Sequence, residues 1–310
     1  ARGEIRGMYI MGENPAMSDP DLDHARSAIA SLEHLVVQDL FLTETACFAD
    51  VVLPASGAPE KTGTFVNTDR RVQMGRAALE MPQGVRQDLD IIQEIARRIG
   101  LDWHYEGPAD VQEEFRQAMP SITGITWERL EREDSITYPC PDTSHPGQGV
   151  MFGDEDFPTV DGRAQLVPAR FHQDHYLPDR EYPFVLITGR QLEHWHTGAM
   201  TRRASTLDTL EPDAVAMLHP REMEGLGLAP GDRMTVRSRQ GEVEMFVRPD
   251  DGLQLGQVFI PFAYREAAAN LLTNEAIDPD GKIPEFKFSA VQVEPAKKTQ
   301  AAPASTVGVS

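Results

Sequence analysis

Short apolar runs separated by helical patterns restrict the fold of this sequence more than any other feature. Residues 9–11, 35–37 and 51–53 each have the character of a strand that is apolar along its whole length. Between and after them, apolar side chains recur at helical spacing, most clearly over 89–99. Strands that are apolar on both faces are typical of a parallel sheet with helices on each side. The first part of the chain therefore predicts an α/β fold, an open parallel sheet covered by helices.

The second half of the chain is predicted to be rich in β-structure. Short strands between turn residues are expected at 184–187, 215–218, 234–238, 242–247 and 258–260. Their fairly even spacing favours a closed barrel. From 101 to 180 the pattern is lost, and prolines and glycines leave little room for regular elements. The predicted organisation is an α/β domain at 1–138, a connection at 139–180, a barrel domain at 181–296 and a disordered tail at 297–310.

Net charge and composition exclude several classes of partner. The chain has 29 basic and 49 acidic residues, a formal charge of −20. A surface this acidic repels the phosphates of nucleic acids and of anionic membranes, so we expect neither as a partner. No apolar run approaches the ~20 residues that cross a bilayer, and two cysteines cannot build a four-thiolate metal site. The composition predicts a soluble, cytoplasmic protein.

The first strand begins almost at the first residue. Apolar residues at 8–11 follow a start that carries neither an initiator methionine nor a lead-in segment. We therefore expect this chain to be the C-terminal part of a longer polypeptide.

Two places have the character of nucleotide contacts. Asn14 and Asp39 follow the first and second predicted strands, and ligands of open α/β sheets bind outside the carboxyl ends of strands. From the local pattern alone, an ordinary Asn-Pro turn and a solvated aspartate are the simpler explanation of the same residues. In the second half, a predicted strand leads into Thr188 and Gly189, whose backbone could approach a pyrophosphate, and into Arg190, which can bind phosphate.

Two histidines and an aspartate leave alternatives open. His194 and His196 could share a metal from an extended segment, but no third ligand is near them in sequence, so we predict no metal ligand here. Trp195 between them offers a flat apolar face for a ring. Asp88 directly precedes a predicted helix, where aspartate is a favoured cap. Its two carboxylate oxygens would equally match the N1–H and amino group of guanine.

Several motifs give the chain a family resemblance over 8–100 and 183–294. They are Gly12-Glu13-Asn14-Pro15, the stretch from Val37 to Ala46, Ala49 to Pro54, Glu60 to Gln73, and Thr188 to Arg203 with His194-Trp195-His196-Thr197-Gly198. In these motifs the chain resembles the molybdopterin oxidoreductases of the dimethyl sulfoxide reductase type. The sequence of these motifs is most similar to the C-terminal part of the large (alpha) subunits of molybdenum-containing, NAD-linked formate dehydrogenases.

The resemblance implies a bis(molybdopterin guanine dinucleotide) cofactor with molybdenum or tungsten. By motif position, the α/β domain would contact one guanine dinucleotide through Asn14, Gln38, Asp39, Lys61 and Asp88. The barrel, of the double-psi type in that family, would line pyrophosphate and pterin with Thr188, Gly189, Arg190, Gln191, Leu192, Glu193, His194, Trp195, His196 and Thr197. Later contacts would come from Phe262, Asn270 and Lys287.

The resemblance also implies what lies outside this chain. In the family the metal-binding cysteine or selenocysteine, its neighbouring histidine, a catalytic arginine and the iron–sulfur cysteines precede the matched region, so no catalytic residue is expected here. The implied function is oxidation of formate to carbon dioxide. Its electrons would pass through iron–sulfur clusters in the rest of the same subunit to diaphorase-type partner subunits that hold FMN and NAD. The alternatives are a nitrate reductase catalytic subunit and the non-catalytic large subunit of an NADH:quinone oxidoreductase.

Overall fold

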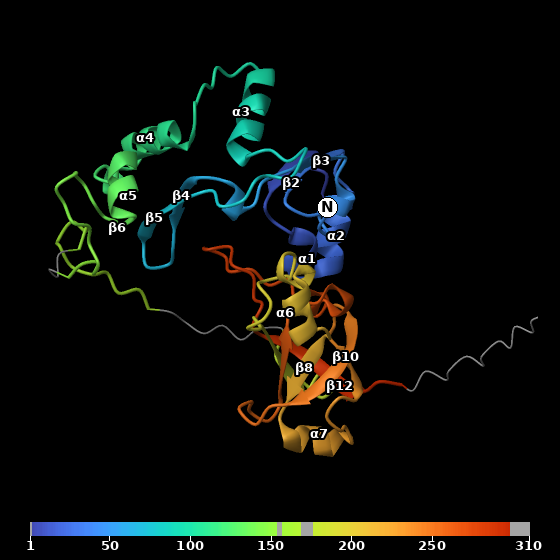
Figure 1. Ribbon diagram of the computed structural model, residues 1–310. Helices are drawn as coiled ribbons and strands as arrows, with labels where there is room; N and C mark the ends of the chain where they lie inside the picture. Colours follow the sequence, from blue (N-terminus) through green and yellow to red (C-terminus); the bar gives the residue numbers. More distant parts are fainter. Residues whose placement is uncertain (1, 154–156, 169–175, 298–310) are drawn as a thin grey trace, which may run out of the picture. The chain divides into compact units, whose positions relative to one another are not determined.

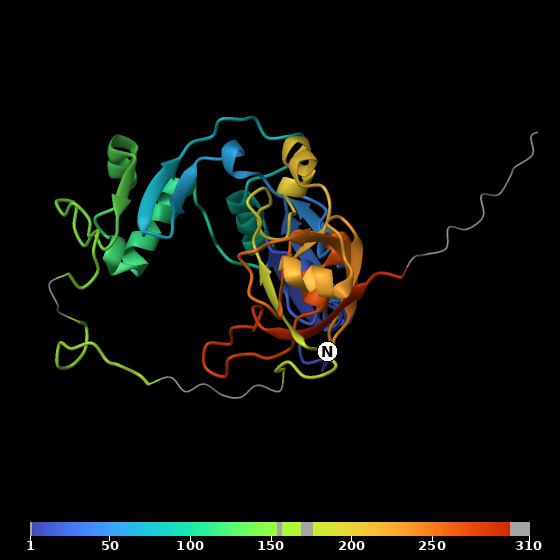
Figure 2. The ribbon, with the colours of Figure 1, turned by 90° about the horizontal axis from the view of Figure 1, so that it is seen from below.

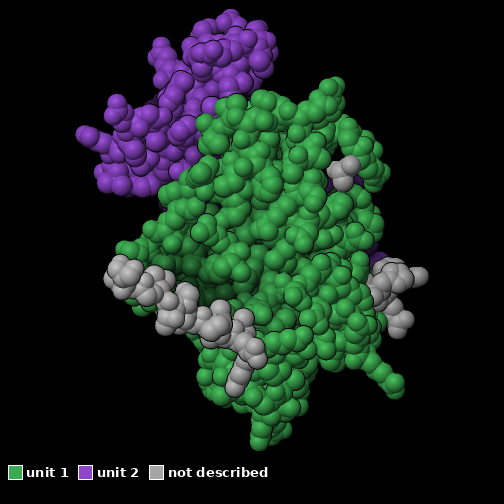
Figure 3. Space-filling model, turned by 90° about the vertical axis from the view of Figure 1, so that its right-hand side faces the viewer, with its two compact units in different colours: residues 1–37, 41–52, 172–310 green, residues 38–40, 53–171 purple. Residues whose placement is uncertain are grey.

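The chain divides into two compact units that do not follow the order of the sequence (Figure 3). The computed structural model describes residues 2–153, 157–168 and 176–297. Unit 1 contains residues 1–37, 41–52 and 172–310, and unit 2 contains residues 38–40 and 53–171. The N-terminal segment thus belongs to the same unit as the barrel. The domain boundaries predicted from the sequence stay a prediction, and the predicted tail lies from residue 298 onward outside the described residues.

A three-stranded sheet near the N-terminus confirms the first three predicted strands. Its strand order is β1 (Gly7–Met11), β2 (His34–Asp39) and β3 (Val51–Pro54). The first connection carries helices α1 (Pro15–Ser18) and α2 (Leu22–Ala30), and a short 3-10 helix, η1 (Ala46–Phe48), precedes β3. A small core made of Ile10, Ala16, Ile29, Leu35, Val37 and Ala46 holds this region together.

Within the described residues, two strands of this sheet keep exposed apolar side chains, so the predicted helical cover on both faces stays a prediction. In β1 only Ile10 is buried, while Met8, Tyr9 and Met11 are exposed. In β3 Val51 and Val52 are exposed as well.

Residues 184–295 form the closed six-stranded barrel that the sequence predicts (Figures 1 and 2). The order around the barrel is β10-β8-β11-β7-β12-β9. The strands are β7 (Phe184–Gly189), β8 (Val215–Leu218), β9 (Arg233–Arg237), β10 (Glu242–Pro249), β11 (Gln257–Pro261) and β12 (Ser289–Pro295), with helices α6 (Ser205–Leu210) and α7 (Pro220–Leu226) in the connections. The first five strands lie where they were predicted, and β12 was not foreseen. The double-psi connection stays a prediction.

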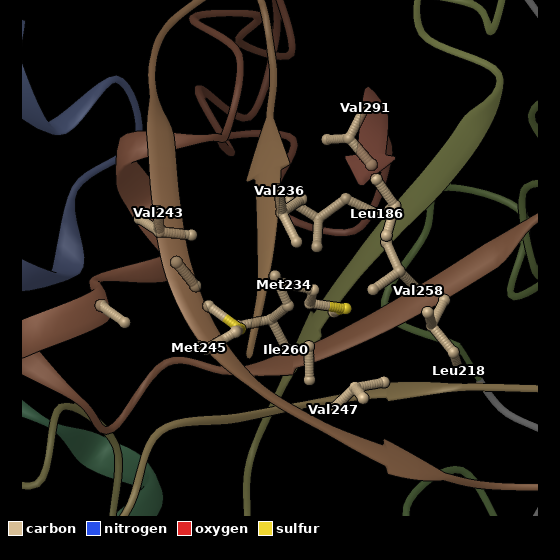
Figure 4. Close-up of a cluster of buried hydrophobic side chains, with 14 of the residues drawn as sticks. Leu186, Leu218, Met234, Val236, Val243, Met245, Val247, Val258, Ile260 and Val291 are labelled. Atoms are coloured by element: carbon tan, nitrogen blue, oxygen red, sulfur yellow. The ribbon is translucent and has the colours of Figure 1, made fainter. Parts of the chain in front are cut away.

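Alternating side chains fill the barrel with an apolar core (Figure 4). Leu186, Met234, Val236, Val258 and Ile260 are at most 1% exposed, and their side chains point toward one another inside the barrel. Successive residues of a strand point to opposite faces, so every second residue of β7, β9 and β11 enters this core. The interior of the barrel is thus packed, and ligand-binding groups have to lie on its loops.

Unit 2 combines a second sheet with three helices. The sheet order is β4 (Gly63–Val66), β5 (Arg71–Gly75) and β6 (Ser135–Thr137), paired antiparallel. The helices are α3 (Asp88–Arg98), α4 (Pro108–Ala118) and α5 (Trp127–Glu133), with 3-10 turns η2 (Ala58–Glu60) and η3 (Pro120–Ile122). The prediction that 101–180 holds few regular elements is therefore wrong for 108–137. Val72, Ile122, Ile125, Leu130 and Ile136, which form a core with Cys140, give these elements their stability.

Among the described residues, no helix combines the length and the apolar character needed to cross a membrane.

Candidate cofactor-binding site

A cavity of about 480 Å³ lies in unit 1 at the end of the barrel strands β7 and β11. Four segments that are far apart in the sequence meet there: the end of α1, the loop after β7, the residues after β11 and those before β12. The lining residues are Ser18, Asp19, Arg190, His196, Thr197, Phe262, Asn270, Pro284, Phe286 and Lys287. Six of them were predicted as cofactor contacts.

The pairing of two parallel strands explains why these segments meet. β7 and β11 run in parallel, with Thr188 opposite Ile260 and Gly189 opposite Pro261. Both strands therefore release their following loops at the same end of the barrel. A Cβ at Gly189 would lie 2.3 Å from the ring of Phe259, so a larger residue here would have to displace that ring.

Residues 286–287 are tied to the end of β7 by hydrogen bonds. The hydroxyl of Thr188 donates to the carbonyl oxygen of Phe286 at 2.7 Å, and the ammonium of Lys287 donates to the carbonyl oxygen of Thr188. This bond joins two of the predicted cofactor contacts across almost a hundred residues of sequence, and their contact with a cofactor stays a prediction. The side chain of Thr188 itself is buried, so its hydroxyl serves the fold in this structure.

The cavity wall carries basic groups without acidic partners. Neither Arg190 nor Lys287 forms a salt bridge with any residue that the structure describes. Lys287 lies 5.9 Å from the ring centre of Phe262, and burial followed by the nearby charge of Arg190 lowers its pKa. Asp19 is the one carboxylate among the described lining residues, and desolvation raises its pKa. An anion bound here would be attracted by both Arg190 and Lys287, because neither charge is paired with a described carboxylate.

The loop after β7 directs only part of its predicted contacts into this cavity. Arg190, His196 and Thr197 line it, whereas Leu192 and Trp195 are exposed to solvent, with 96% and 58% of their surfaces accessible. Gln191 and Glu193 are half-buried and do not line it. The cofactor contacts proposed for these last four residues stay predictions.

His194 points into the protein instead of into the cavity. It is only 1% exposed, and its Nε2 lies 2.8 Å from the carbonyl oxygen of Glu211. Since a carbonyl oxygen only accepts, Nε2 carries the proton. The ring stacks edge-on against Tyr264, whose hydroxyl donates to Gln191 Oε1 and to the same carbonyl oxygen of Glu211, each at 3.1 Å. In this structure His194 holds the loop after β7 against the barrel through its contacts with Glu211 and Tyr264. Its proposed contact with a cofactor stays a prediction.

The side-chain amides of two predicted asparagines form hydrogen bonds within the protein. Asn270 donates to the carbonyl oxygens of Met17 and Ser18, at 2.9 and 3.0 Å, and so fixes the end of α1 at the cavity. Asn14 is 8% exposed and does not line the cavity. Its Oδ1 accepts from the backbone and hydroxyl of Thr45, and its Nδ2 donates to Glu44 at 2.8 Å.

A second cluster of predicted residues lies in unit 2. Gln38 is buried at the end of β2, and its Nε2 donates to Asp88 Oδ1 at 2.7 Å. The ammonium of Lys61 donates to the other carboxylate oxygen, Oδ2, and also reaches the carbonyl oxygen of Ser56 at 3.4 Å. About a quarter of the Lys61 and Asp88 side chains remains accessible, 25% and 28%. The structure thus joins three predicted residues from three separate places in the sequence.

The capping interpretation of Asp88 is wrong. Helix α3 begins at Asp88 itself, with Gln87 in the cap position and no side-chain capping hydrogen bond. Asp88 sits inside the first turn, so its carboxylate is directed to Gln38 and Lys61. The predicted fourth member of this group, Asp39, accepts from the backbone N–H of Leu40 at 2.6 Å. Its role toward a ligand stays a prediction.

Four cavity residues were not found from the sequence. Ser18, Asp19 and Pro284 carry no local signal, because only the meeting of distant segments makes them neighbours. Phe286 directly precedes Lys287, a predicted cofactor contact, and this position next to it in the sequence was the one available signal. Within the described ranges, no group of three His, Cys, Asp or Glu side chains is placed to hold a metal ion.

Comparison with known families matches both parts of the chain. Residues 1–98 match the molybdopterin oxidoreductase model, and residues 184–290 match the molydopterin dinucleotide-binding domain. The chain belongs to the molybdopterin oxidoreductase family. The second match covers all of the barrel except most of β12, and it includes eight of the ten residues that line the cavity.

Curated relatives extend the match over nearly the whole chain. It is 43% identical over 292 residues to the F420-dependent formate dehydrogenase subunit alpha of Methanocaldococcus jannaschii, covering 94% of this chain and 43% of that protein. It is 34% identical over 304 residues to formate dehydrogenase H of Escherichia coli K12, covering 97% of this chain and 42% of that protein. The chain therefore spans less than half the length of these curated relatives.

A solved structure supports the same fold. Acetylene hydratase from Pelobacter acetylenicus superimposes with a TM-score of 0.77 at 20% sequence identity, covering 94% of this chain and 44% of that one. At this identity the similarity concerns the fold alone.

Proposed function

We propose that this chain is the cofactor-binding C-terminal part of the catalytic subunit of a molybdenum formate dehydrogenase. The observation that carries the proposal is the cavity at the end of β7 and β11, where Arg190 and Lys287 lie beside two phenylalanine rings and form no salt bridge with a described residue. The similarity to formate dehydrogenase alpha subunits along 94% of the chain supports formate as the substrate of the whole protein.

The residues present suit a molybdopterin guanine dinucleotide. Arg190 and Lys287 offer cationic donors to a pyrophosphate, which arginine binds in bidentate fashion and lysine as a point charge. Phe262 and Phe286 provide apolar faces for a ring system. In unit 2, the accessible part of Asp88 offers carboxylate lone pairs to the N1–H and amino group of a guanine.

In the proposed holoprotein two such dinucleotides bind, one to each of these groups of residues. When bound, the cofactor supplies the metal centre at which formate gives up two electrons. The residues of this chain bind and orient the cofactor.

The path of the electrons is part of the same proposal. We propose NAD as the acceptor, reached through iron–sulfur clusters in the rest of the subunit and FMN on diaphorase-type partners in the cytoplasm. The resemblance of the motifs, taken together, to molybdenum-containing, NAD-linked formate dehydrogenases supports this acceptor. Coenzyme F420 is the competing acceptor, because the relatives with 43% and 38% identity are named as F420-dependent.

The test is to purify the full-length subunit with its co-purifying partners and to measure molybdenum, guanine nucleotide and formate oxidation. Formate oxidation with NAD, against none with F420, is the expected result. Activity with F420 alone would contradict the acceptor and leave the substrate standing. Reduction of nitrate, or a protein without the cofactor, would contradict the proposed enzyme and favour the nitrate reductase or the non-catalytic subunit.

A further inference from the structure

The contact between Arg190 and His196 reveals the protonation state of the histidine in the cavity. Arg190 Nη2 lies 3.3 Å from His196 Nε2. A guanidinium has only donors and keeps its charge, so the imidazole nitrogen has to accept. His196 is therefore neutral in this arrangement, with its proton on Nδ1. The backbone of His196 has a φ of +47°, a left-handed conformation that places the ring here at some conformational cost.

The surroundings of His196 disfavour a positive charge as long as the cavity holds no anion. Desolvation and then the charge of Arg190 lower its pKa, while Glu13 acts weakly in the opposite direction. The rings of Trp195 and Phe262 lie 4.5 and 6.2 Å from the imidazole and carry no charge. Lys287 adds a further positive group to the cavity wall, and Asp19 a single negative one.

We propose that an anion entering this cavity binds together with one proton, which His196 Nε2 takes up from solvent. Two negative charges of a pyrophosphate diester would reverse the local electrostatic balance and favour the imidazolium. Nε2 would then stop accepting from Arg190, and both side chains would donate to anionic oxygens. This inference rests on the proposed dinucleotide site and adds to it a proton-linked loading step.

The direction of the pH dependence follows from the proton balance. Because the complex holds more protons than the free protein, affinity falls as the pH rises. The effect is confined to the interval between the pKa of His196 in the free cavity, which is below its ordinary 6.5, and the higher value in the complex. Within that interval, uptake of about one proton weakens binding about tenfold per pH unit.

The experiment is titration calorimetry on the full-length subunit purified without cofactor, with GDP-mannose as the probe. This compound is a guanosine pyrophosphate diester, and its phosphates do not titrate near neutrality. Repeating the titration in buffers of different ionisation enthalpy counts the protons taken up. The variant is His196→Asn, since asparagine tolerates a left-handed backbone but cannot take up a proton. The matched control is His219→Asn, because His219 caps α7 in the same barrel and asparagine caps equally well.

Uptake of about one proton by the wild type and by His219→Asn, but none by His196→Asn, is the expected result. Binding without proton uptake in the wild type overturns the proposal. Uptake that survives in His196→Asn and is lost in Asp19→Asn also overturns it, because the proton then resides on the carboxylate. Absence of GDP-mannose binding overturns it as well. None of these results decides the proposed function, which is judged from the molybdenum content and formate oxidation of the loaded protein.

Discussion

The two groups of candidate residues differ in how their charges are balanced. In unit 2, Asp88 accepts from both Gln38 and Lys61, so the carboxylate and the ammonium neutralise each other. In the barrel cavity, Arg190 and Lys287 share no salt bridge with any described residue, and their nearest polar partners are an imidazole and a carbonyl oxygen. The first group is preorganised and neutral overall, whereas the two cations of the second have hydrogen-bond partners but no described carboxylate partner.

This difference indicates what each group can recognise. A carboxylate held by two donors presents its remaining lone pairs in a fixed direction, which suits the neutral N–H groups of a base. Uncompensated cations beside apolar rings suit an anionic group attached to a ring system. The two parts of a guanine dinucleotide, its base and its pyrophosphate, make these two demands. The following predictions test the contrast, beginning with the largest expected effect.

Loss of a cavity cation should have the largest effect. Lys287→Met removes a charged donor with little change in volume, and we expect cofactor retention to fall about 10- to 150-fold, because hydrogen bonds to charged groups contribute about 1.5–3 kcal/mol. Molybdenum and guanine per protein after dialysis provide the measurement. Lys282→Met is the control, since Lys282 lies in the same connection and does not line the cavity. Equal retention in both variants would break the contrast between the two sites.

Asp88→Asn should weaken the neutral site by a smaller factor. Asparagine would place an N–H₂ group where the guanine N–H groups are proposed to meet a carboxylate oxygen of Asp88. Such a mispaired group costs about 1–3 kcal/mol, or about 5- to 150-fold in affinity. We expect lower guanine nucleotide content at high salt as well as at low salt, because the lost contacts are to a neutral base. Asp90→Asn, on the exposed side of the same helix, should retain wild-type content. Wild-type content in Asp88→Asn would argue against guanine recognition.

A substitution at Asn14 tests whether this predicted residue serves the stability of the fold or the binding of the cofactor. Asn14→Asp would place a carboxylate against Glu44, whose Oε2 now accepts from the Asn14 amide. We expect the free energy of unfolding to drop by about 1–3 kcal/mol at neutral pH, with partial recovery in acid as the new carboxylate is protonated. Chemical denaturation at several pH values measures this. A variant of wild-type stability that loses the cofactor would instead assign Asn14 to binding.

Much of the fold was predictable because periodicity and turn residues are local signals. The first three strands and five barrel strands lie where apolar runs were found. Helix α3 was found as well, but its apolar spacing matches the buried face only in part: Ala96 is buried, whereas Ile99 is 70% exposed. Spacing alone does not reveal which side of a helix meets a neighbour when the neighbour comes from a distant part of the chain.

The candidate site was predictable to the extent that a motif names its residues. Motif position selected Arg190, Asn270 and Lys287, and the structure gathers them at one cavity. The same reasoning could not distinguish His196, which lines the cavity, from His194, which points into the protein. The two histidines lie two residues apart, and their side chains point in different directions because the backbone at His196 is left-handed. The residue types in this segment do not predict that conformation.

The smallest effect is expected from the group beneath the cavity loop. Tyr264 is 1% exposed, and burial raises its pKa from 10.0 to about 12. Between these two values an unfolded tyrosine loses its proton while the folded one keeps it, so this group lowers stability as the pH rises from 10 to about 12. Tyr264→Phe should therefore lose less stability than the wild type across that interval.

At neutral pH the substitution Tyr264→Phe should cost only about 1 kcal/mol of stability. The variant lacks the hydroxyl and its hydrogen bonds to Gln191 and Glu211, while the ring keeps its contacts with Arg202 and His194. Denaturant unfolding at pH 7, 10 and 11.5 compares the two proteins. Parallel losses in both would show that Tyr264 is not the group that titrates, and a much larger cost at pH 7 would show that the loop above it depends on this hydroxyl.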